Sequence, residues 1–243
     1  MTAHFDDGTG RVTWFEPQDL ADPAEQPEVE SWETEDAHHG VAVSVGEDRW
    51  VHTEGTAESR SGVRLVEGEG KDGLVVVRGD RIEKVDAPDR YGRIGNQAGS
   101  EASPYVRGDY TTDADAELER PTRVSVVDTR TPALRLVGLG TSYSFRSLGR
   151  TEDGDGLVLG TDGALHEIDV RRARVGDPIP VVEAWREPLD WTEPRPTLEV
   201  IGSTAYVTDP AVRALHVVDL ERGEVVATHD LPQVPDELVA LPG

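Results

Sequence analysis

The 243-residue sequence contains no cysteine, which excludes a disulfide framework, a thiolate zinc site and a cysteine nucleophile. It has no apolar run close to the roughly 18 residues that a membrane-spanning helix needs. It also lacks the sustained 3.6-residue apolar period of an amphipathic helix. Residues 1–7 have neither the basic start nor the apolar run of a signal peptide. We therefore expect a chain built from strands, with no membrane span and no export signal in the sequence as written.

Positive charge is also scarce. The sequence has 24 basic and 48 acidic residues, and only Lys71 and Lys84 are lysines. The formal net charge of −24 repels nucleic-acid phosphates and anionic lipid headgroups, and it attracts cations. We therefore expect no nucleic-acid partner. The acidic surface either keeps the protein soluble or collects cations. The first reading is favoured because net charge bears on solubility before it bears on function.

Turn-forming residues are plentiful, with 25 glycines and 16 prolines, which favours many short strands. The phrase ALHEID at 164–169 returns as ALHVVD at 214–219, and a related RVSVVD occupies 123–128. The three phrases end at Asp128, Asp169 and Asp219, at separations of 41 and 50 residues. This spacing suits the four-stranded blade of a β-propeller, which takes about 40 to 50 residues.

Short apolar segments separated by Gly, Asp and Pro turns predict four strands in each of the last two units. They lie at 143–148, 156–161, 164–170 and 179–182, and at 197–201, 204–208, 213–219 and 224–229. Earlier strands are predicted at 40–45, 49–53, 62–67, 74–78 and 81–86, with a strand at 10–16 that has no earlier partner. At about 45 residues per blade the chain holds five to six blades. We predict an all-β propeller of four-stranded antiparallel blades, one domain over residues 1–243, whose ring need not close.

Two segments depart from the strand pattern. Residues 17–37 are rich in Pro, Glu and Asp, which predicts an acidic surface loop. Residues 87–121 are long for a loop, but Tyr91, Tyr105 and Tyr110 give them apolar anchors. We predict that this second segment is an ordered excursion between blades.

A metal site is predicted where the acidic segment enters a strand. His38 and His39 follow Asp36, and neutral imidazole and carboxylate are zinc ligands. Adjacent histidines in a strand point to opposite faces, so one of the two is expected to reach a given site. His52 lies on the next predicted strand, opposite this entrance across a short turn. The candidate ligands are His38, His39, Asp36 and His52. The alternative is one packed histidine and one exposed histidine.

The remaining polar residues favour packing over chemistry. His166 and His216 hold the same place in two units, which is typical of packing. Ser142 and Ser144 have no evident His or Asp partner. The sequence contains no nucleophile elbow, phosphate loop or dinucleotide fingerprint between a strand and a helix. We therefore identify no catalytic and no cofactor-binding residues, and we expect that the protein is not an enzyme.

Several motifs give the sequence a family likeness. They are YGRIGNQAGSE at 91–101, GDY at 108–110, ERPTRVS at 119–125, GTSYSFRSL at 140–148 and LGTDG at 159–163. Together they resemble the AztD-type zinc metallochaperones of bacteria, over residues 36–243. The resemblance implies a single-domain β-propeller outside the cytoplasm that hands zinc to the solute-binding protein of an ABC importer.

The sequence also departs from that family. Family members begin with an export signal and a His-rich stretch. They have further blades before the region of His38 and His39. They also commonly carry two cysteines with a His-Gly-Glu motif where this chain has residues 67–72. The chain therefore looks like an N-terminally shortened relative, and zinc affinity is the property that these departures affect most. His38, His39 and Gly40 form the motif that transfers most directly.

Three functions are considered. The first is zinc binding and delivery to an importer's solute-binding protein by an extracytoplasmic monomer, as the resemblance implies. The second is a non-catalytic interaction propeller with no specific metal role, which docks proteins through residues 87–121 and the acidic loop. The third and weakest is an enzyme that would need Glu101, Arg146 and Tyr143 close together in the central funnel.

Overall fold

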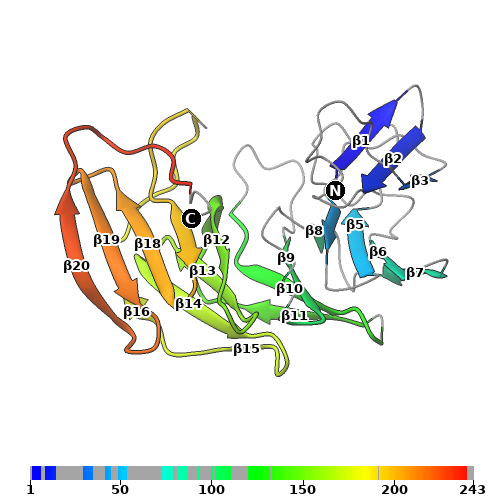
Figure 1. The fold of residues 1–243 in the computed structure, drawn as a ribbon. Coiled ribbons are helices and arrows are strands. Elements are labelled where there is room, and N and C mark those ends of the chain that lie inside the picture. The colour runs from blue at the N-terminus through cyan, green and yellow to red at the C-terminus, as the bar shows by residue number, and fades with distance from the viewer. Residues whose placement is uncertain are drawn as a thin grey trace, which may run out of the picture.

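The structure is a computed structural model, and it describes residues 100, 102–110, 120–131, 133–190 and 192–239 together with the strands that precede residue 100. Every regular element in the described residues is a β-strand, and every pairing between them is antiparallel. The strands form five sheets, which follow one another in chain order (Figure 1). We call these sheets blades 1 to 5. The described residues include no helix that could cross a membrane.

Each blade is a meander whose strands pair with their neighbours in the sequence. Blade 1 contains β1 (Thr2–Asp6), β2 (Thr9–Trp14) and β3 (Glu30–Thr34). Blade 2 contains β4 (Ala42–Ser44), β5 (Arg49–Thr53), β6 (Gly73–Arg78) and β7 (Arg81–Asp86). Blade 3 contains β8 (Gly92–Arg93), β9 (Tyr105–Tyr110), β10 (Arg123–Asp128) and β11 (Ala133–Gly138).

The last two blades are those that the repeated phrases predict. Blade 4 contains β12 (Tyr143–Arg150), β13 (Gly156–Gly160), β14 (Ala164–Asp169), β15 (Arg174–Val175) and β16 (Ile179–Pro180). Blade 5 contains β17 (Leu198–Ile201), β18 (Thr204–Asp209), β19 (Ala214–Asp219) and β20 (Glu224–Asp230). Strand β14 pairs with β15 at one end and with β16 at the other. The prediction of an all-β fold made of antiparallel, mostly four-stranded units is confirmed.

Three sequence expectations need correction. The acidic segment 17–37 is not a loop throughout, because Glu30–Thr34 forms β3 and pairs with β2. The strand at 10–16 does have an earlier partner, since β1 pairs with β2. The segment 87–121 contributes two strands of blade 3, β8 and β9. In each case the added strand is short and forms by backbone pairing with a neighbouring strand. The strand predicted at 62–67 lies outside the described residues.

Apolar faces of successive blades pack against each other. Blade 3 meets blade 4 through Tyr105, Val124, Val126, Val137 and Leu139 on one side and Tyr143, Leu148, Val158, Ile168 and Val170 on the other. Blade 4 meets blade 5 through Leu157, Leu159 and Leu165 on one side and Leu198, Ala205, Val207 and Val218 on the other. The core thus lies between blades, which is how sheets repeated around an axis bury their faces.

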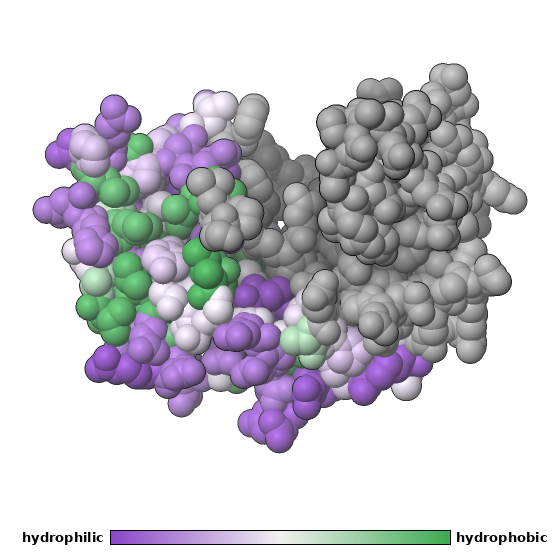
Figure 2. Space-filling view, viewed as in Figure 1, coloured by the Kyte–Doolittle hydropathy of each residue, from purple (hydrophilic) through white to green (hydrophobic). Residues whose placement is uncertain are grey.

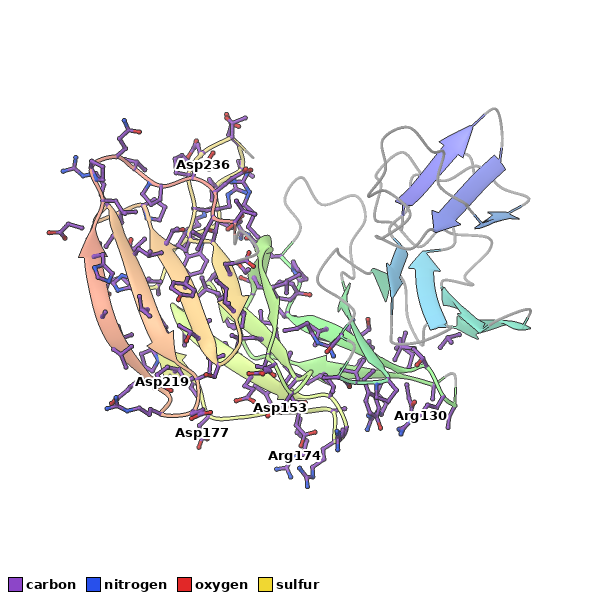
Figure 3. The ribbon with its side chains drawn as sticks, in the orientation of Figure 1. Arg130, Asp153, Arg174, Asp177, Asp219 and Asp236 are labelled. Atoms are coloured by element: carbon purple, nitrogen blue, oxygen red, sulfur yellow. The ribbon has the colours of Figure 1, made fainter. Side chains whose placement is uncertain are left out.

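Figure 3 shows how charged side chains gather at the ends of the strands. Arg130, Asp153, Arg174, Asp177 and Asp219 lie in turns or at strand ends along one end of blades 3 to 5, and Asp236 lies at the opposite end. Asp236 belongs to the segment after β20, which returns toward β12. There the Arg146 guanidinium donates to Oδ1 of Asp236 at 2.8 Å and pairs with Glu237 at 3.0 Å. This ion-pair cluster fixes the C-terminal segment to blade 4.

Candidate functional site

Of the four predicted metal ligands, one is placed by its backbone. His52 lies on β5, opposite Ala42 of β4 and Val75 of β6. The expected hairpin between the strand that follows His38-His39 and the strand of His52 is therefore present. Asp36, His38 and His39 lie outside the described residues, so the ligand set stays a prediction.

The two histidines of the repeated phrase have a pairing that the sequence did not indicate. His166 lies opposite Val158 in blade 4, and His216 lies opposite Val207 in blade 5, so the two histidines are equivalent. Each faces an aspartate. Nε2 of His166 lies 3.0 Å from Oδ2 of Asp162, with the imidazole side chain 7% exposed.

The partner in blade 5 comes from another position. Nε2 of His216 lies 3.7 Å from Oδ2 of Asp209, and its Nδ1 lies 3.0 Å from Oγ1 of Thr228. Asp209 is the last residue of β18, and the register makes it equivalent to Gly160 of β13. A side chain at Gly160 would collide with Asp162, and its Cβ would lie 3.0 Å from Nε2 of His166. Blade 4 thus uses a glycine and a later aspartate where blade 5 uses the strand aspartate itself.

Each histidine faces one carboxylate of its own blade, and His166 makes a hydrogen bond to it whereas His216 does not. The packing role stays a prediction from the repeat. The sequence analysis did not identify Asp162 and Asp209 as the residues that these histidines face. The available signal was the Asp162-Gly163 turn, in which the aspartate precedes His166 by four residues and also accepts from the Ala164 amide at 3.3 Å.

The residues of the enzyme hypothesis have structural partners. Tyr143 is 1% exposed, and its hydroxyl donates to the Arg123 carbonyl at 2.8 Å. Arg146 binds the C-terminal segment, and Glu101 lies outside the described residues. Ser142 shares a hydrogen bond with Thr161. Ser144 shares one with Ser147 at 3.0 Å, beside the register shift of β12. These hydroxyls are used in strand and turn contacts rather than aimed at a base.

A buried ion pair organises the connection between blades 4 and 5. Nη1 of Arg195 lies 2.8 Å from Oε1 of Glu187, with the two side chains 3% and 6% exposed. The Trp185 indole donates to the other oxygen of Glu187 at 3.2 Å. Arg195 also donates to the backbone carbonyls of Asp190 and Glu193. The pair therefore fixes the course of this long connection.

An acidic group lies at the turn end of blade 4. Burial, followed by the charges of Asp155, Asp153 and Asp169, raises the pKa of Glu167 above its ordinary value. Carboxylates gathered in this way could attract a cation. However, the residues whose side chains are described include no group of three or more His, Asp or Glu side chains that could hold a metal ion.

Comparison with known proteins gives a consistent likeness. No family model matches the chain. The zinc chaperone AztD of Citrobacter koseri is 27% identical over 124 residues, which are 51% of this chain and 30% of that protein. The chain thus matches less than a third of the length of this relative.

Solved structures of the same relative share the fold. A crystal structure of Citrobacter koseri AztD has a TM-score of 0.60 and 20% identity, with 82% of this chain and 61% of that chain covered. The structure of apo AztD from Citrobacter koseri has a TM-score of 0.64 and 18% identity, with 95% and 69% covered. The likeness to AztD-type proteins that the sequence motifs predicted is confirmed, and so is the propeller fold.

Proposed function

We propose that this AztD-like propeller binds zinc and hands it to the solute-binding protein of an ABC importer outside the cytoplasm. The observation that carries the proposal is the sequence likeness to a zinc chaperone, which a common fold accompanies. In this role the chain supplies nitrogen and oxygen ligands and performs no reaction. Zinc is the cargo rather than a resident cofactor.

His38 or His39 would bind the ion, assisted by Asp36 or His52. Chain length supports this grouping. His39 precedes Ala42 by three residues, which span at most about 11 Å when extended. Ala42 lies opposite His52, and the Cα atoms of such a pair are about 5 Å apart. Chain length therefore allows His39 to approach His52.

The charge of the protein favours the same role. A net charge of −24 raises the concentration of divalent cations near the surface. Imidazole binds zinc only when it is neutral, so affinity is expected to fall as the pH drops below about 6.5. A pH dependence in this range would identify histidine, rather than carboxylates alone, as the ligand.

Isothermal titration with zinc tests the proposal. We expect a Kd tighter than about 10 μM at pH 7.5, and at least a tenfold weakening in the double variant His38→Ala/His39→Ala. The matched control is His229→Ala, which removes an exposed histidine from β20. Weaker binding in the unsubstituted chain, or equal binding in the double variant, would sink the zinc proposal.

Delivery needs a separate measurement. Zinc-loaded protein mixed with the apo solute-binding protein of a zinc importer should transfer the ion faster than free dissociation followed by capture. The second candidate is an interaction propeller without a metal role, which docks proteins through residues 87–121 and the acidic loop. It predicts that partner capture is unchanged in the presence of a chelator.

A further inference from the structure

The connection between blades 4 and 5 is longer than a link between two blades requires. It covers residues 181–197, whereas residues 139–142 are enough to join blade 3 to blade 4. Connections of more than about 12 to 15 residues without regular structure are uncommon, and they are usually either functional or disordered. This connection lies within the described fold, with blade 4 before it and blade 5 after it.

The middle of the connection is held in one shape by its own side chains. The buried ion pair of Glu187 and Arg195 closes its base at 2.8 Å. Arg195 also donates to the carbonyl of Asp190 at 2.7 Å and to that of Glu193 at 3.2 Å. The Asp190 carboxylate accepts from the amide and the hydroxyl of Thr192, at 2.9 Å and 2.7 Å. These contacts make an ordered surface loop, of the compact kind that is frequently functional.

The ordered loop presents an apolar side chain to solvent. Leu189 is 62% exposed. Around it, the exposed charges are the carboxylates of Glu183, Asp190 and Glu193 and the guanidinium of Arg186. Because the backbone that carries Leu189 is already fixed, a partner that buries this side chain orders little of the chain on binding. An apolar anchor with a polar rim is the anatomy of a specific protein contact. We call residues 183–195 the Leu189 loop.

The Leu189 loop lies at the end of the propeller to which the predicted zinc ligands belong. The Trp185 amide donates to the Thr161 carbonyl at 2.9 Å, which sets the loop beside the turn after the second strand of blade 4. In a meander, this turn and the connections between blades lie at the same end of the sheet. His52 lies near the end of the second strand of blade 2, and His38 and His39 precede the first strand of that blade in the sequence.

The opposite end of blades 3 to 5 has a different character. Charged side chains such as Arg130, Asp153 and Arg174 lie there, and Figure 2 shows hydrophilic residues along it. At the end with Leu189, a second apolar side chain is exposed, since Val212 in the turn between β18 and β19 is 64% exposed. A partner that recognises an apolar anchor therefore finds it at the end of the predicted zinc ligands.

We propose that the Leu189 loop docks the protein that accepts zinc from this chain, with Leu189 as its apolar anchor. The identity of the partner rests on the proposed function. The surface that fits the loop is an apolar hollow bordered by basic side chains, because Glu183, Asp190 and Glu193 surround the leucine. The net charge of −24 speeds the encounter with such a basic surface. Docking at this end brings the acceptor to the predicted ligands, so the ion passes between proteins without entering bulk solvent.

Leu189→Asp tests the loop without disturbing the fold, because the side chain is exposed. The added carboxylate suits a basic rim, so weaker docking reports the lost apolar contact rather than a wrong charge. Leu189→Met keeps an apolar side chain of similar volume and should dock as the unsubstituted chain does. Ile201→Asp is the matched control, since Ile201 is 52% exposed in the hairpin between β17 and β18, at the opposite end of the blade.

Surface plasmon resonance measures docking, with the apo solute-binding protein of a zinc importer from the same bacterium immobilised and with zinc present or absent. We expect Leu189→Asp to raise the Kd by about tenfold or more, as loss of an anchor does, and Leu189→Met and Ile201→Asp to leave it unchanged. The association rate constant should fall as salt concentration rises. In a stopped-flow transfer assay, Leu189→Asp should slow zinc transfer to the rate of free dissociation, with its zinc Kd unchanged.

The readouts separate this proposal from the proposed function. Equal docking by Leu189→Asp and the unsubstituted chain overturns the role of the loop, and so does an equal loss in Ile201→Asp. An unsubstituted chain that does not dock, with or without zinc, also overturns it. Docking that depends on Leu189 in a chain that binds no zinc supports the role of the loop and overturns the zinc proposal instead.

Discussion

Nε2 of the buried His166 lies 3.0 Å from Oδ2 of Asp162, a carboxylate that reaches it across the space left by Gly160. The equivalent histidine of the next blade, His216, lies 3.7 Å from Asp209, which stands at the position of Gly160. Two blades therefore place a carboxylate beside the same imidazole position, from different places in the sequence. In blade 4 the contact gives the buried nitrogen of His166 a hydrogen-bond partner, whereas Nε2 of His216 has none.

The difference between these two contacts gives a prediction. Asp162→Ala leaves the His166 nitrogen buried and unpaired, which should lower the free energy of unfolding by about 1–3 kcal/mol. Asp209→Ala should lower it by about 1 kcal/mol or less, because the 3.7 Å separation is too long for a hydrogen bond. Each aspartate also accepts a hydrogen bond from a backbone amide in its turn. Both variants lose such a bond, so this loss does not account for the expected difference between them. Urea denaturation measures both values, and equal losses would contradict the assignment.

Gly160 is predicted to be needed for space rather than for backbone freedom. In Gly160→Ala the new Cβ would collide with Oδ1 of Asp162 and lie 2.5 Å from Cγ2 of Thr141. We expect the free energy of unfolding to fall by about 1–3 kcal/mol, as in other overpacked sites. Gly138→Ala is the matched control, since no atom lies within 4 Å of its added Cβ. A neutral effect at Gly160 would show that Asp162 can move away without loss.

The blades could be predicted from the sequence because the signals are local. The repeated phrase marks one strand of each blade, buried on both faces in blades 3 and 4. The Gly and Asp residues after each strand mark the turns. In blade 3, however, β9 has few apolar residues and a glycine, Gly108. It forms because β10 pairs with it along its whole length. Pairing of this kind depends on partners distant in sequence, so a window of local pattern does not contain it.

The partners of buried polar groups were harder to predict, for the same reason. Arg195 follows Glu187 by eight positions in the connection between blades 4 and 5, and nothing in their spacing indicates that both are buried. Asp162 and Asp209 are not at equivalent positions, so comparison of the repeats hides their common role. The metal ligands remain a prediction from residue type and order, because only His52 among them has a described backbone.

The buried ion pair between Glu187 and Arg195 should be one of the most sensitive sites for substitution. Glu187→Gln leaves a buried guanidinium without its counter-charge, and it should lower the free energy of unfolding by about 3–5 kcal/mol. The control is Arg172→Ala, which breaks the exposed pair with Asp169, where the two side chains are 76% and 28% exposed. An exposed pair of this kind contributes little to stability. Similar small losses in both variants, measured by urea denaturation, would mean that water reaches Arg195.

Glu167 gives a prediction about pH. Burial, and then the charges of Asp155, Asp153 and Asp169, raise the pKa of Glu167 above the ordinary value of 4.5. In the window between the two values the folded chain binds more protons than the unfolded chain, so the contribution of this group to stability falls as pH rises. The penalty is fully present above the folded pKa and absent below the ordinary one.

Glu167→Gln should therefore raise the free energy of unfolding at pH 7.5, and this gain should disappear toward about pH 4. Urea denaturation across this range tests the sign, with Glu221→Gln as the exposed control. A gain that is equal at both ends of the range would assign the effect to packing of the amide rather than to the buried charge.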